Sequence, residues 1–581
     1  MHSEYTIIKI CTTQDLQPHI SAIKQAKVIA VDTETTGLSP HVHKLRLIQI
    51  AAEGLPVFVI DCFTFLPNGL QLIKDILETR TIKVFQNAKF DLQFFMALGI
   101  YPAPLFDTML AAQLLRTSGG PSRAGLNVLA QHYLNEVINK DEQTSDWSGE
   151  LSDKQIEYAA KDADVLLRLR AVMIEDIYEN SLSEIALIEF SCASAIAQIE
   201  HTGICLNILR WNTLLKTTEK ARDKALDILY GYTSRPIIQM TLTGEDVITG
   251  HNFDSNPFVL KLLQRNGIFV ESTSKSDLSP YLNNPLVRAL SDYRKAAKAL
   301  SSFLYPIPKM VSAKTGKLHP RYGQLGAWSG RMTCSSPNIQ QIPRSKEFRA
   351  CFVAPPGRKL IIADYSQIEL RVAADMTNDQ RMITAYKNGD DLHKLTASLM
   401  LNKSISTITT QERQAAKAVN FGLIYSMGAA GLKQYSQQSY GVDMTLEQAE
   451  KFKKRFFAAY TGIARWHSTL KKSPPTEGRT MAGRKFTFSN SALSALCNMP
   501  VQGTAADIVK KALGLLVSRL KGTDTYIIGV VHDEILLEAP EDNAAPTAEL
   551  LKTIMEEAGN SILKNVPCQA DVNIADNWAA L

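Results

Sequence analysis

Two places in the second half of the chain join carboxylates to apolar runs. Leu360–Ala363 is typical of a buried strand and ends at Asp364, and the tip His532-Asp533-Glu534 separates the apolar runs Tyr526–Val531 and Ile535–Leu537. An unpaired carboxylate at the end of a core strand is costly to bury, and a bound divalent cation compensates for that cost. For Asp364 alone, a cap of the next helix is the favoured interpretation, and the tip acids could be simple turn formers.

A second pair of acids lies near the N-terminus. Asp32 and Glu34 follow the apolar run Ala26–Val31, which is typical of a buried strand. Residues two apart on a strand point to the same face, so both carboxylates face the same way. Two adjacent like charges repel each other unless a cation lies between them, and the pair therefore indicates a cation site.

Further along, a phenol and two more acids could complete that site. Asp91 falls at a predicted helix start after Asn87, and Tyr158 and Asp162 share one face of a predicted helix near 154–170. Taken singly, Asp91 could be an N-cap and Tyr158 an ordinary amphipathic residue. Together with the strand pair they make four carboxylates and a phenol, which favours a functional site.

A third pattern places cations and aromatics on one helix. Thr409 and Glu412 fit a capping box, which predicts a helix start. After it, four side chains recur every four residues along one face: Arg413, Lys417, Phe421 and Tyr425. Cations near a helix N-terminus suit phosphate, and aromatics suit bases and sugars. The aromatics alone favour an amphipathic core helix, but a core face would not carry Arg413 and Lys417.

The elements that must position these residues are predicted from periodicity. In the first part, strands at Leu45–Ala51, Val57–Asp61 and Ile82–Phe85, with a helix near Leu70–Leu77, predict an α/β sandwich. The middle is helical over Ser183–His201, ended by Gly203, and over Trp211–Tyr230. A small hairpin is expected within Ile237–Val247, inside an extra stretch (232–250) with no assigned function. Lys295 and Lys298 suit backbone phosphates or, equally, a solvated face.

Bulk composition bounds the class of protein. The 581 residues are 45% hydrophobic and 21% charged with a formal net charge of +5, which is compatible with a polyanionic partner. This length predicts about two to four domains. Eight cysteines without a CxxC pair indicate neither a zinc site nor a disulfide framework. The start lacks a leader pattern and no apolar run is long enough to span a membrane, so we expect a cytoplasmic protein.

The N-terminal motifs resemble those of a nuclease family. DTET, NAKFD and YAAKD look like the three motifs of DEDD-type 3′→5′ exonucleases with a tyrosine in the third, and FDTMLAAQLL and SDW match their surroundings. The resemblance implies a ribonuclease-H-like domain over residues 1–185 that hydrolyses DNA with two Mg²⁺ ions. It implies that Tyr158 orients the attacking water and that four acids bind the metals: Asp32, Glu34, Asp91 and Asp162.

The rest of the chain resembles family A DNA polymerases of the bacterial DNA polymerase I type. The resemblance is carried by SGRM within Lys314–Pro343, which composition alone would describe as a linker, and by DYSQIELR, the helix from Thr409, and VHDE. It implies a right-hand polymerase domain over 186–581. Its thumb would cover about 190–320, its palm about 321–372 and 490–581, and its fingers about 373–489.

The resemblance also implies a role for each motif residue. Asp364, Asp533 and the Tyr365 carbonyl would hold two Mg²⁺ ions, with Mn²⁺ as a substitute, and Glu534 would support them. The residues implied to bind the nucleotide are Gln367, Glu369, His393, Arg413, Lys417, Phe421 and Tyr425. Those implied to contact DNA are Arg331, Asn498, Gln502 and His532.

For three of these residues the resemblance implies a role in selecting the sugar of the nucleotide or in proton transfer. Glu369 would stand under the incoming sugar and exclude a 2′-hydroxyl by volume and by leaving it poorly partnered. Phe421 in place of tyrosine implies discrimination against dideoxynucleotides, and Lys417 would protonate the leaving pyrophosphate. The sequence departs from the family at Leu493-Ser494, where Glu-Arg is usual, so one DNA-contacting arginine is absent.

The expected activity is template-directed DNA synthesis with proofreading. The expected partners are primer–template DNA and deoxynucleoside triphosphates, and the expected form is a monomer; the motifs identify no helicase or single-strand-binding protein. Asp32 lies close to the N-terminus, which predicts that no 5′-nuclease domain precedes it and fits a phage replicase. The alternatives are an RNA-synthesising relative, which Glu369 and the exonuclease motifs disfavour, and a non-catalytic accessory protein.

Overall fold

The computed structural model describes residues 5–138, 141–142, 144–233, 237–240, 246–249, 252–488 and 492–580. The N-terminal sheet has the strand order β1-β4-β3-β2-β5-β6, and its β2–β3 and β3–β4 pairs are antiparallel while the other pairs are parallel. Its strands are β1 (Ile7–Ile10), β2 (Val28–Thr35), β3 (Leu45–Ala52), β4 (Val57–Asp61), β5 (Ile82–Phe85) and β6 (Leu105–Asp107). The predicted α/β arrangement is confirmed.

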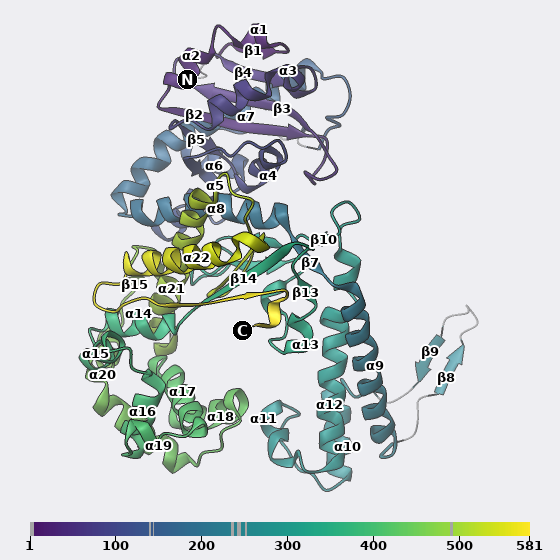
Figure 1. Ribbon diagram of the computed structural model, residues 1–581, viewed down its shortest axis with the longest axis vertical. Coiled ribbons are helices and arrows are strands. Elements are labelled where there is room, and N and C mark those ends of the chain that lie inside the picture. The colour runs from purple at the N-terminus through teal and green to yellow at the C-terminus, as the bar shows by residue number, and fades with distance from the viewer. Residues whose placement is uncertain are drawn as a thin grey trace.

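Helices pack around this sheet, which lies at the top of Figure 1. They include α3 (Cys62–Leu77), α4 (Lys89–Ala97), α5 (Thr108–Leu115) and α7 (Asp153–Glu179). Helix α7 lies against β2, β3 and β4. The prediction of a helix near Leu70–Leu77 was too short, because the Asp61 side chain accepts a hydrogen bond from the Phe63 backbone N–H at 3.1 Å and starts α3 earlier.

Two long helices lead from the N-terminal region to an arm. Helix α8 (Ser183–Thr202) ends at Gly203, as predicted, and that glycine has φ +67°. Helices α9 (Ile208–Tyr230) and α12 (Pro285–Ala299) pack along each other, and α10 (Asn256–Arg265) and α11 (Lys275–Leu278) lie near their far end (Figure 1). Strands β8 (Ile237–Met240) and β9 (Asp246–Thr249) form the predicted hairpin, whose connecting residues lie outside the described ones.

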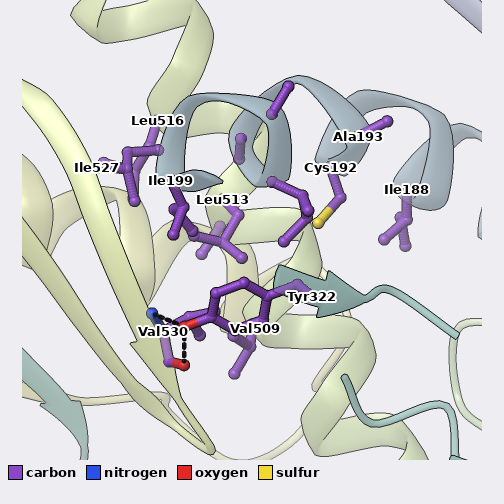
Figure 2. Close-up of a cluster of buried hydrophobic side chains, with 14 of the residues drawn as sticks. Ile188, Cys192, Ala193, Ile199, Tyr322, Val509, Leu513, Leu516, Ile527 and Val530 are labelled. Atoms are coloured by element: carbon purple, nitrogen blue, oxygen red, sulfur yellow. Dashed lines mark hydrogen bonds between the residues drawn. The ribbon is translucent and has the colours of Figure 1, made fainter. Parts of the chain in front are cut away.

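The second major sheet is antiparallel throughout, with the order β17-β18-β14-β19. Its strands are β14 (Arg358–Tyr365), β17 (Tyr526–Val531), β18 (Glu534–Pro540) and β19 (Ala570–Ala575). Helices α8 and α22 (Ala544–Asn560) pack against it, and α21 (Leu493–Leu520) packs against both helices. In Figure 2, Cys192, Leu513 and Ile527 fill the core between α8, α21 and β17. The Tyr322 hydroxyl in the same core donates to the Val530 carbonyl at 3.0 Å.

A group of helices completes the fold opposite the arm (Figure 1). They are α14 (Ile368–Met376), α15 (Gln380–Lys387), α16 (Leu392–Leu401), α17 (Thr410–Ile424), α18 (Ala429–Tyr440), α19 (Leu446–Ala459) and α20 (Thr461–Lys472). The capping box at Thr409 and Glu412 is present, with backbone-to-side-chain hydrogen bonds of 3.2 and 2.9 Å. A small hairpin, β15 (Glu477–Arg479) and β16 (Lys485–Thr487), leads back to α21.

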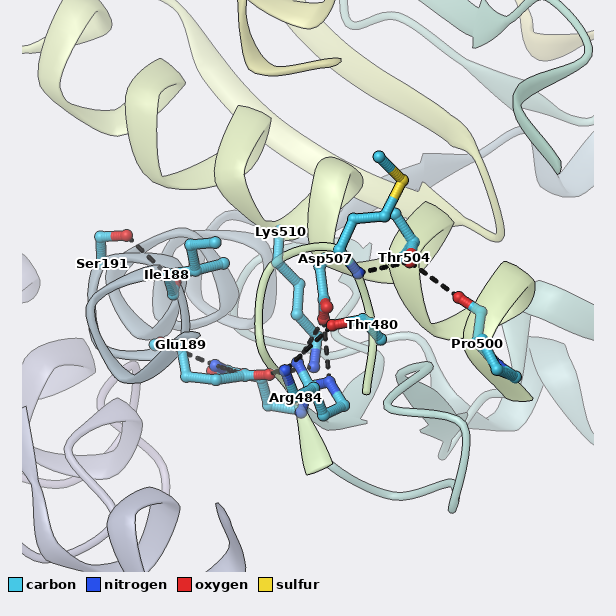
Figure 3. A network of polar contacts seen from close by, with 11 residues as sticks. Ile188, Glu189, Ser191, Thr480, Arg484, Pro500, Thr504, Asp507 and Lys510 are labelled. Atoms are coloured by element: carbon cyan, nitrogen blue, oxygen red, sulfur yellow. Dashed lines mark hydrogen bonds and ion pairs between the residues drawn. The ribbon is translucent and has the colours of Figure 1, made fainter. Parts of the chain in front are cut away.

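A buried ionic network ties α8 to α21 and to the β15–β16 connection (Figure 3). The Lys510 ammonium lies 2.7 Å from the Glu189 carboxylate, and both side chains are fully buried. Arg484 also pairs with Glu189, and its Nε donates to Asp507 at 2.9 Å. Each buried charge therefore has an opposite partner, which keeps the desolvation cost from being left uncompensated.

Candidate active sites

The N-terminal acids converge on β2, an inner strand of the first sheet. Asp32 and Glu34 lie on β2 and Asp162 on α7, and one oxygen from each of the three carboxylates lies within 4.8 Å of the others. Asp91 on α4 is buried beside them and accepts a hydrogen bond from the Thr33 hydroxyl at 2.5 Å. The structure thus brings together all four acids of the predicted set.

The electrostatics of this cluster are dominated by burial and by repulsion between its own carboxylates. Burial, followed by repulsion from Asp91 and Asp162, raises the pKa of Asp32 well above its ordinary value. Burial together with the same two acids raises the pKa of Glu34 to about 9, and burial raises that of Asp91 to about 7. A set of carboxylate oxygens in this state fits a hard divalent cation, which would restore the ionised forms.

Tyr158 lies one turn before Asp162 on α7, as the spacing predicted. Burial, then the charges of Asp162 and Glu34, raise the pKa of its phenol, so the hydroxyl stays protonated and can donate a hydrogen bond. The buried Trp147 ring lies 6.4 Å from the Tyr158 ring between centroids. The side of the cluster that carries the phenol is therefore held by packing.

The second pair of acids meets at one end of the second sheet. Asp364 on β14 is paired across the sheet with Glu534 on β18, and the Tyr365 backbone N–H donates to the Asp533 carbonyl at 3.3 Å. His532 and Asp533 form the tight turn between β17 and β18, with His532 at φ +60°. Asp364 and Asp533 therefore lie side by side, although they are far apart in the sequence.

Two details of the predicted elements were wrong here. Asp364 does not end its strand, since β14 continues to Tyr365, and Glu534 belongs to β18 rather than to the turn. The pairing of Asp364 with Glu534 extends both strands by one or two residues beyond the apolar runs, because backbone hydrogen bonds and not side-chain polarity set the end of a ladder.

The electrostatics of this pair resemble those of the first cluster. Burial and the charges of Asp533 and Glu534 raise the pKa of Asp364 to about 7, and burial is the main cause of the raised pKa of Asp533. The buried Oδ1 atom of Asp364 has no hydrogen-bond partner within the described part of the chain. Such an orphaned carboxylate oxygen fits a divalent cation bound between the two aspartates.

Glu534 is held by two residues that sequence reasoning missed. Arg349 pairs with its carboxylate at 3.0 Å, and the Trp578 indole N–H donates to it. The Arg349 guanidinium also lies 4.5 Å from the Trp578 ring centroid. All three side chains are buried. Neither partner lies in a recognisable motif, so no local signal pointed to them.

Glu369 lies between two predicted functional residues. Its carboxylate forms an ion pair with Arg331 and accepts a hydrogen bond from the Tyr425 hydroxyl. Arg331 was predicted as a DNA contact, and the structure places it on Glu369 instead of leaving it unpaired. Gln367, two residues earlier, has φ +58° and accepts a hydrogen bond from Tyr386 at 3.2 Å.

The predicted stripe on α17 faces α16. Arg413 pairs with Asp391 at 2.7 Å, and the Phe421 ring lies 6.0 Å from the His393 ring between centroids. His393 is buried, its ring nitrogen lies 2.9 Å from the Asn420 amide, and burial with the Arg413 charge lowers its pKa to about 4. Its role as a phosphate contact stays a prediction. Burial and Arg413 also lower the pKa of Lys417.

Two further groups border this site. Asn498 and Gln502 lie on α21, which begins at Leu493 and accommodates Pro500 inside the helix. The exposed Arg344 was missed, although its position directly after Pro343 in a predicted loop was a usable signal. The positive charge of Arg344 acts to lower the pKa values of Asp364, Asp533 and Lys417.

Fold and sites together define a polymerase joined to an exonuclease. Residues 7–177 match the family described as 3'-5' exonuclease, and residues 260–580 match DNA polymerase family A. The chain belongs to DNA polymerase family A and is a DNA-directed DNA polymerase with 3′-5′ exonuclease activity, as predicted.

Individual relatives agree with this family. The chain is 33% identical to DNA polymerase I of Aquifex aeolicus, over 97% of this chain and 98% of that one. It is 29% identical to DNA polymerase I of Chloroflexus aurantiacus, over 99% of this chain and 63% of that one. A solved structure, the POL domain of Pol1 from M. smegmatis in complex with DNA primer-template and dNTP, matches with a TM-score of 0.79 at 23% identity, over 99% of this chain and 100% of that one.

Within the described ranges, no helix is both long and apolar enough to cross a membrane.

Proposed function

We propose that the chain extends the 3′ end of a DNA primer with deoxynucleotides at Asp364 and Asp533 and removes mispaired ends at the N-terminal acids. The observation that carries the proposal is the meeting of two half-buried aspartates from distant segments, one of them with an oxygen that has no hydrogen-bond partner among the described residues. The neighbouring M. smegmatis structure is described with primer-template and dNTP, which supports the same substrates for this chain.

At the polymerase site, Asp364, Asp533 and the Tyr365 carbonyl would hold two Mg²⁺ ions. When bound, such ions lower the pKa of a 3′-hydroxyl and stabilise the charge of a leaving pyrophosphate. Glu534 is committed to Arg349 and Trp578, so its proposed part is to keep the turn in place.

The chain's own groups would bind the triphosphate and move a proton. Arg413 and Lys417 lie on the face of α17 that carries Phe421. The lowered pKa of Lys417 makes its ammonium a readier acid, which supports proton donation to pyrophosphate. Glu369, fixed by Arg331 and Tyr425, would stand against the sugar, and Gln367 and His393 would complete the nucleotide site.

At the exonuclease site, the four clustered acids would hold two divalent ions that supply hydroxide and stabilise the in-line transition state. Tyr158, whose phenol stays protonated, would donate a hydrogen bond to the attacking water. Residues 1–185 would form the exonuclease domain and 186–581 the polymerase domain. Arg344, Asn498, Gln502 and His532 would contact DNA.

Separate variants should remove the two activities independently. We expect Asp533→Asn to lower primer extension by at least about 100-fold while leaving exonuclease activity intact, because the site loses a charge aimed at the transition state. The double variant Asp32→Ala, Glu34→Ala should lose exonuclease activity and keep primer extension. Extension is measured with a labelled primer–template, and hydrolysis with a labelled single strand.

The exposed Asp542, at the far end of β18, supplies the matched control Asp542→Asn, which should keep both activities. Extension by Asp533→Asn at the wild-type rate would contradict the polymerase assignment. Hydrolysis that survives the double change would contradict the exonuclease assignment.

A further inference from the structure

An exposed tryptophan stands at the tip of a short hairpin in the palm segment. Strands β11 (Arg321–Gly323) and β12 (Thr333–Ser335) pair antiparallel, and the loop between them carries Trp328, which is 70% exposed. The fold leaves several other large side chains exposed, but an indole in water offers a flat face on which a base can stack.

The loop that carries the indole is closed by its own backbone. The Gly326 N–H donates to Gly323 at 3.1 Å, and the Gly330 N–H donates to Ala327 at 2.9 Å. Gly330 has φ +80°, and a Cβ atom there would lie 2.5 Å from Arg484 Nε. These contacts fix the backbone on both sides of Trp328.

The exonuclease domain supplies a cation beside this ring. Arg116, directly after α5, places its guanidinium carbon 6.0 Å from the Trp328 ring centroid. Within the described residues, Arg116 forms no ion pair, and its buried Nε has no hydrogen-bond partner. The other cations lining this hollow are neutralised, Arg484 by Glu189 and Asp507 and Lys485 by Glu477 at 3.1 Å. Arg116 is thus the cation available to an external anion.

The position of this pair connects the two sites. The hollow around Arg116 and Trp328 is about 90 Å³. A second hollow of about 210 Å³ shares Leu325 and Gly326 with it and reaches Asn87, at the start of the helix that carries Asp91. In the other direction, the same loop continues to Arg331, which is bound to Glu369.

We propose that Trp328 and Arg116 bind the unpaired 3′ segment of a DNA primer as it passes from the polymerase site to the exonuclease site. A base stacks on the exposed indole, and the free guanidinium binds a backbone phosphate. This combination of an aromatic platform and a cation suits single-stranded DNA of any sequence, which a mispaired primer end requires. The inference rests on the proposed function, in which both sites act on one strand.

Binding is tested with labelled oligo(dT) by anisotropy, in the Asp32→Ala, Glu34→Ala background so that the strand is not degraded. Trp328→Ala should weaken binding by about five-fold or more, whereas Trp328→Phe, which keeps a stacking ring, should stay close to wild type. Arg116→Gln should lower the slope of log K against log salt by about 0.7, the loss of one single-strand phosphate contact. Lys485→Gln, which removes a neutralised cation of the same hollow, is the matched control and should change neither quantity.

Transfer is tested on a mismatched primer–template in the otherwise wild-type chain, with unlabelled DNA as a trap. We expect Trp328→Ala to lower the fraction of mismatched ends removed before dissociation, with matched-primer extension and dinucleotide hydrolysis unchanged. The proposal is overturned if Trp328→Ala binds oligo(dT) with the affinity of the wild type and leaves the transferred fraction unchanged. It is also overturned if Trp328→Ala lowers only the melting temperature of the protein. Absence of extension and dinucleotide hydrolysis in the wild type would instead overturn the proposed function.

Discussion

At the scale of single residues, Glu369 illustrates how one side chain is fixed by two distant segments. Arg331 reaches it from the β11–β12 loop, and Tyr425 reaches it from the end of α17. A carboxylate held on both sides loses little entropy when a substrate arrives, so it can act as a rigid wall. The sequence indicated all three residues separately, but their contacts depend on the tertiary fold.

Removing this wall should relax the choice of sugar. We expect Glu369→Ala to lower the ratio of kcat/KM for a deoxynucleotide over the matching ribonucleotide by at least about tenfold, or about 1.4 kcal/mol of discrimination. Tyr425→Phe, which keeps the ring but removes one hydrogen bond to Glu369, should have a smaller effect. Single-nucleotide insertion kinetics measure both. A ratio within twofold of wild type for Glu369→Ala would show that another group selects the sugar.

At the scale of elements, helix α8 gives a matched pair of ionic contacts. Glu189→Gln should destabilise the fold by about 3–5 kcal/mol, because Lys510 would keep a buried charge without its partner and Arg484 would keep only Asp507. Glu184 on the same helix lies 3.9 Å from Lys511 with its side chain 62% exposed, so Glu184→Gln should cost less than about 1 kcal/mol. Urea unfolding measures both variants, and equal losses would contradict the assigned importance of the buried network.

The elements also show what the sequence could predict. Hydrophobic periodicity predicted β4 and β5 with their observed bounds and α8 to within one residue. The capping box predicted the start of α17. Both signals are local in the sequence. The early start of α3 was missed, because it depends on a single capping side chain, Asp61. The partners of Glu534 could not be predicted, because Arg349 and Trp578 are distant in sequence and contact it only in the folded chain.

At the scale of the whole molecule, three histidines lie where the exonuclease domain meets the polymerase domain. The His41 ring, from the β2–β3 connection, lies 4.6 Å from both the His201 and His319 rings between centroids. His201 is near the end of α8, and His319 follows β10 (Lys317–Leu318) and contacts the Glu200 carbonyl at 2.9 Å. This cluster joins segments of both domains, so its protonation affects the junction.

Acid should weaken this junction through His201. Burial, then the charges of His41 and His319, lower its pKa to about 4, against about 6.5 in the unfolded chain. Between these values the unfolded state binds more protons, so stability falls as pH falls through this window, by about 2 kcal/mol from pH 7 to pH 5. His201→Gln should remove that part of the pH dependence in urea unfolding, whereas the exposed His132→Gln should not. If His201→Gln loses as much unfolding free energy as the wild type between pH 7 and pH 5, the pH dependence belongs to other groups.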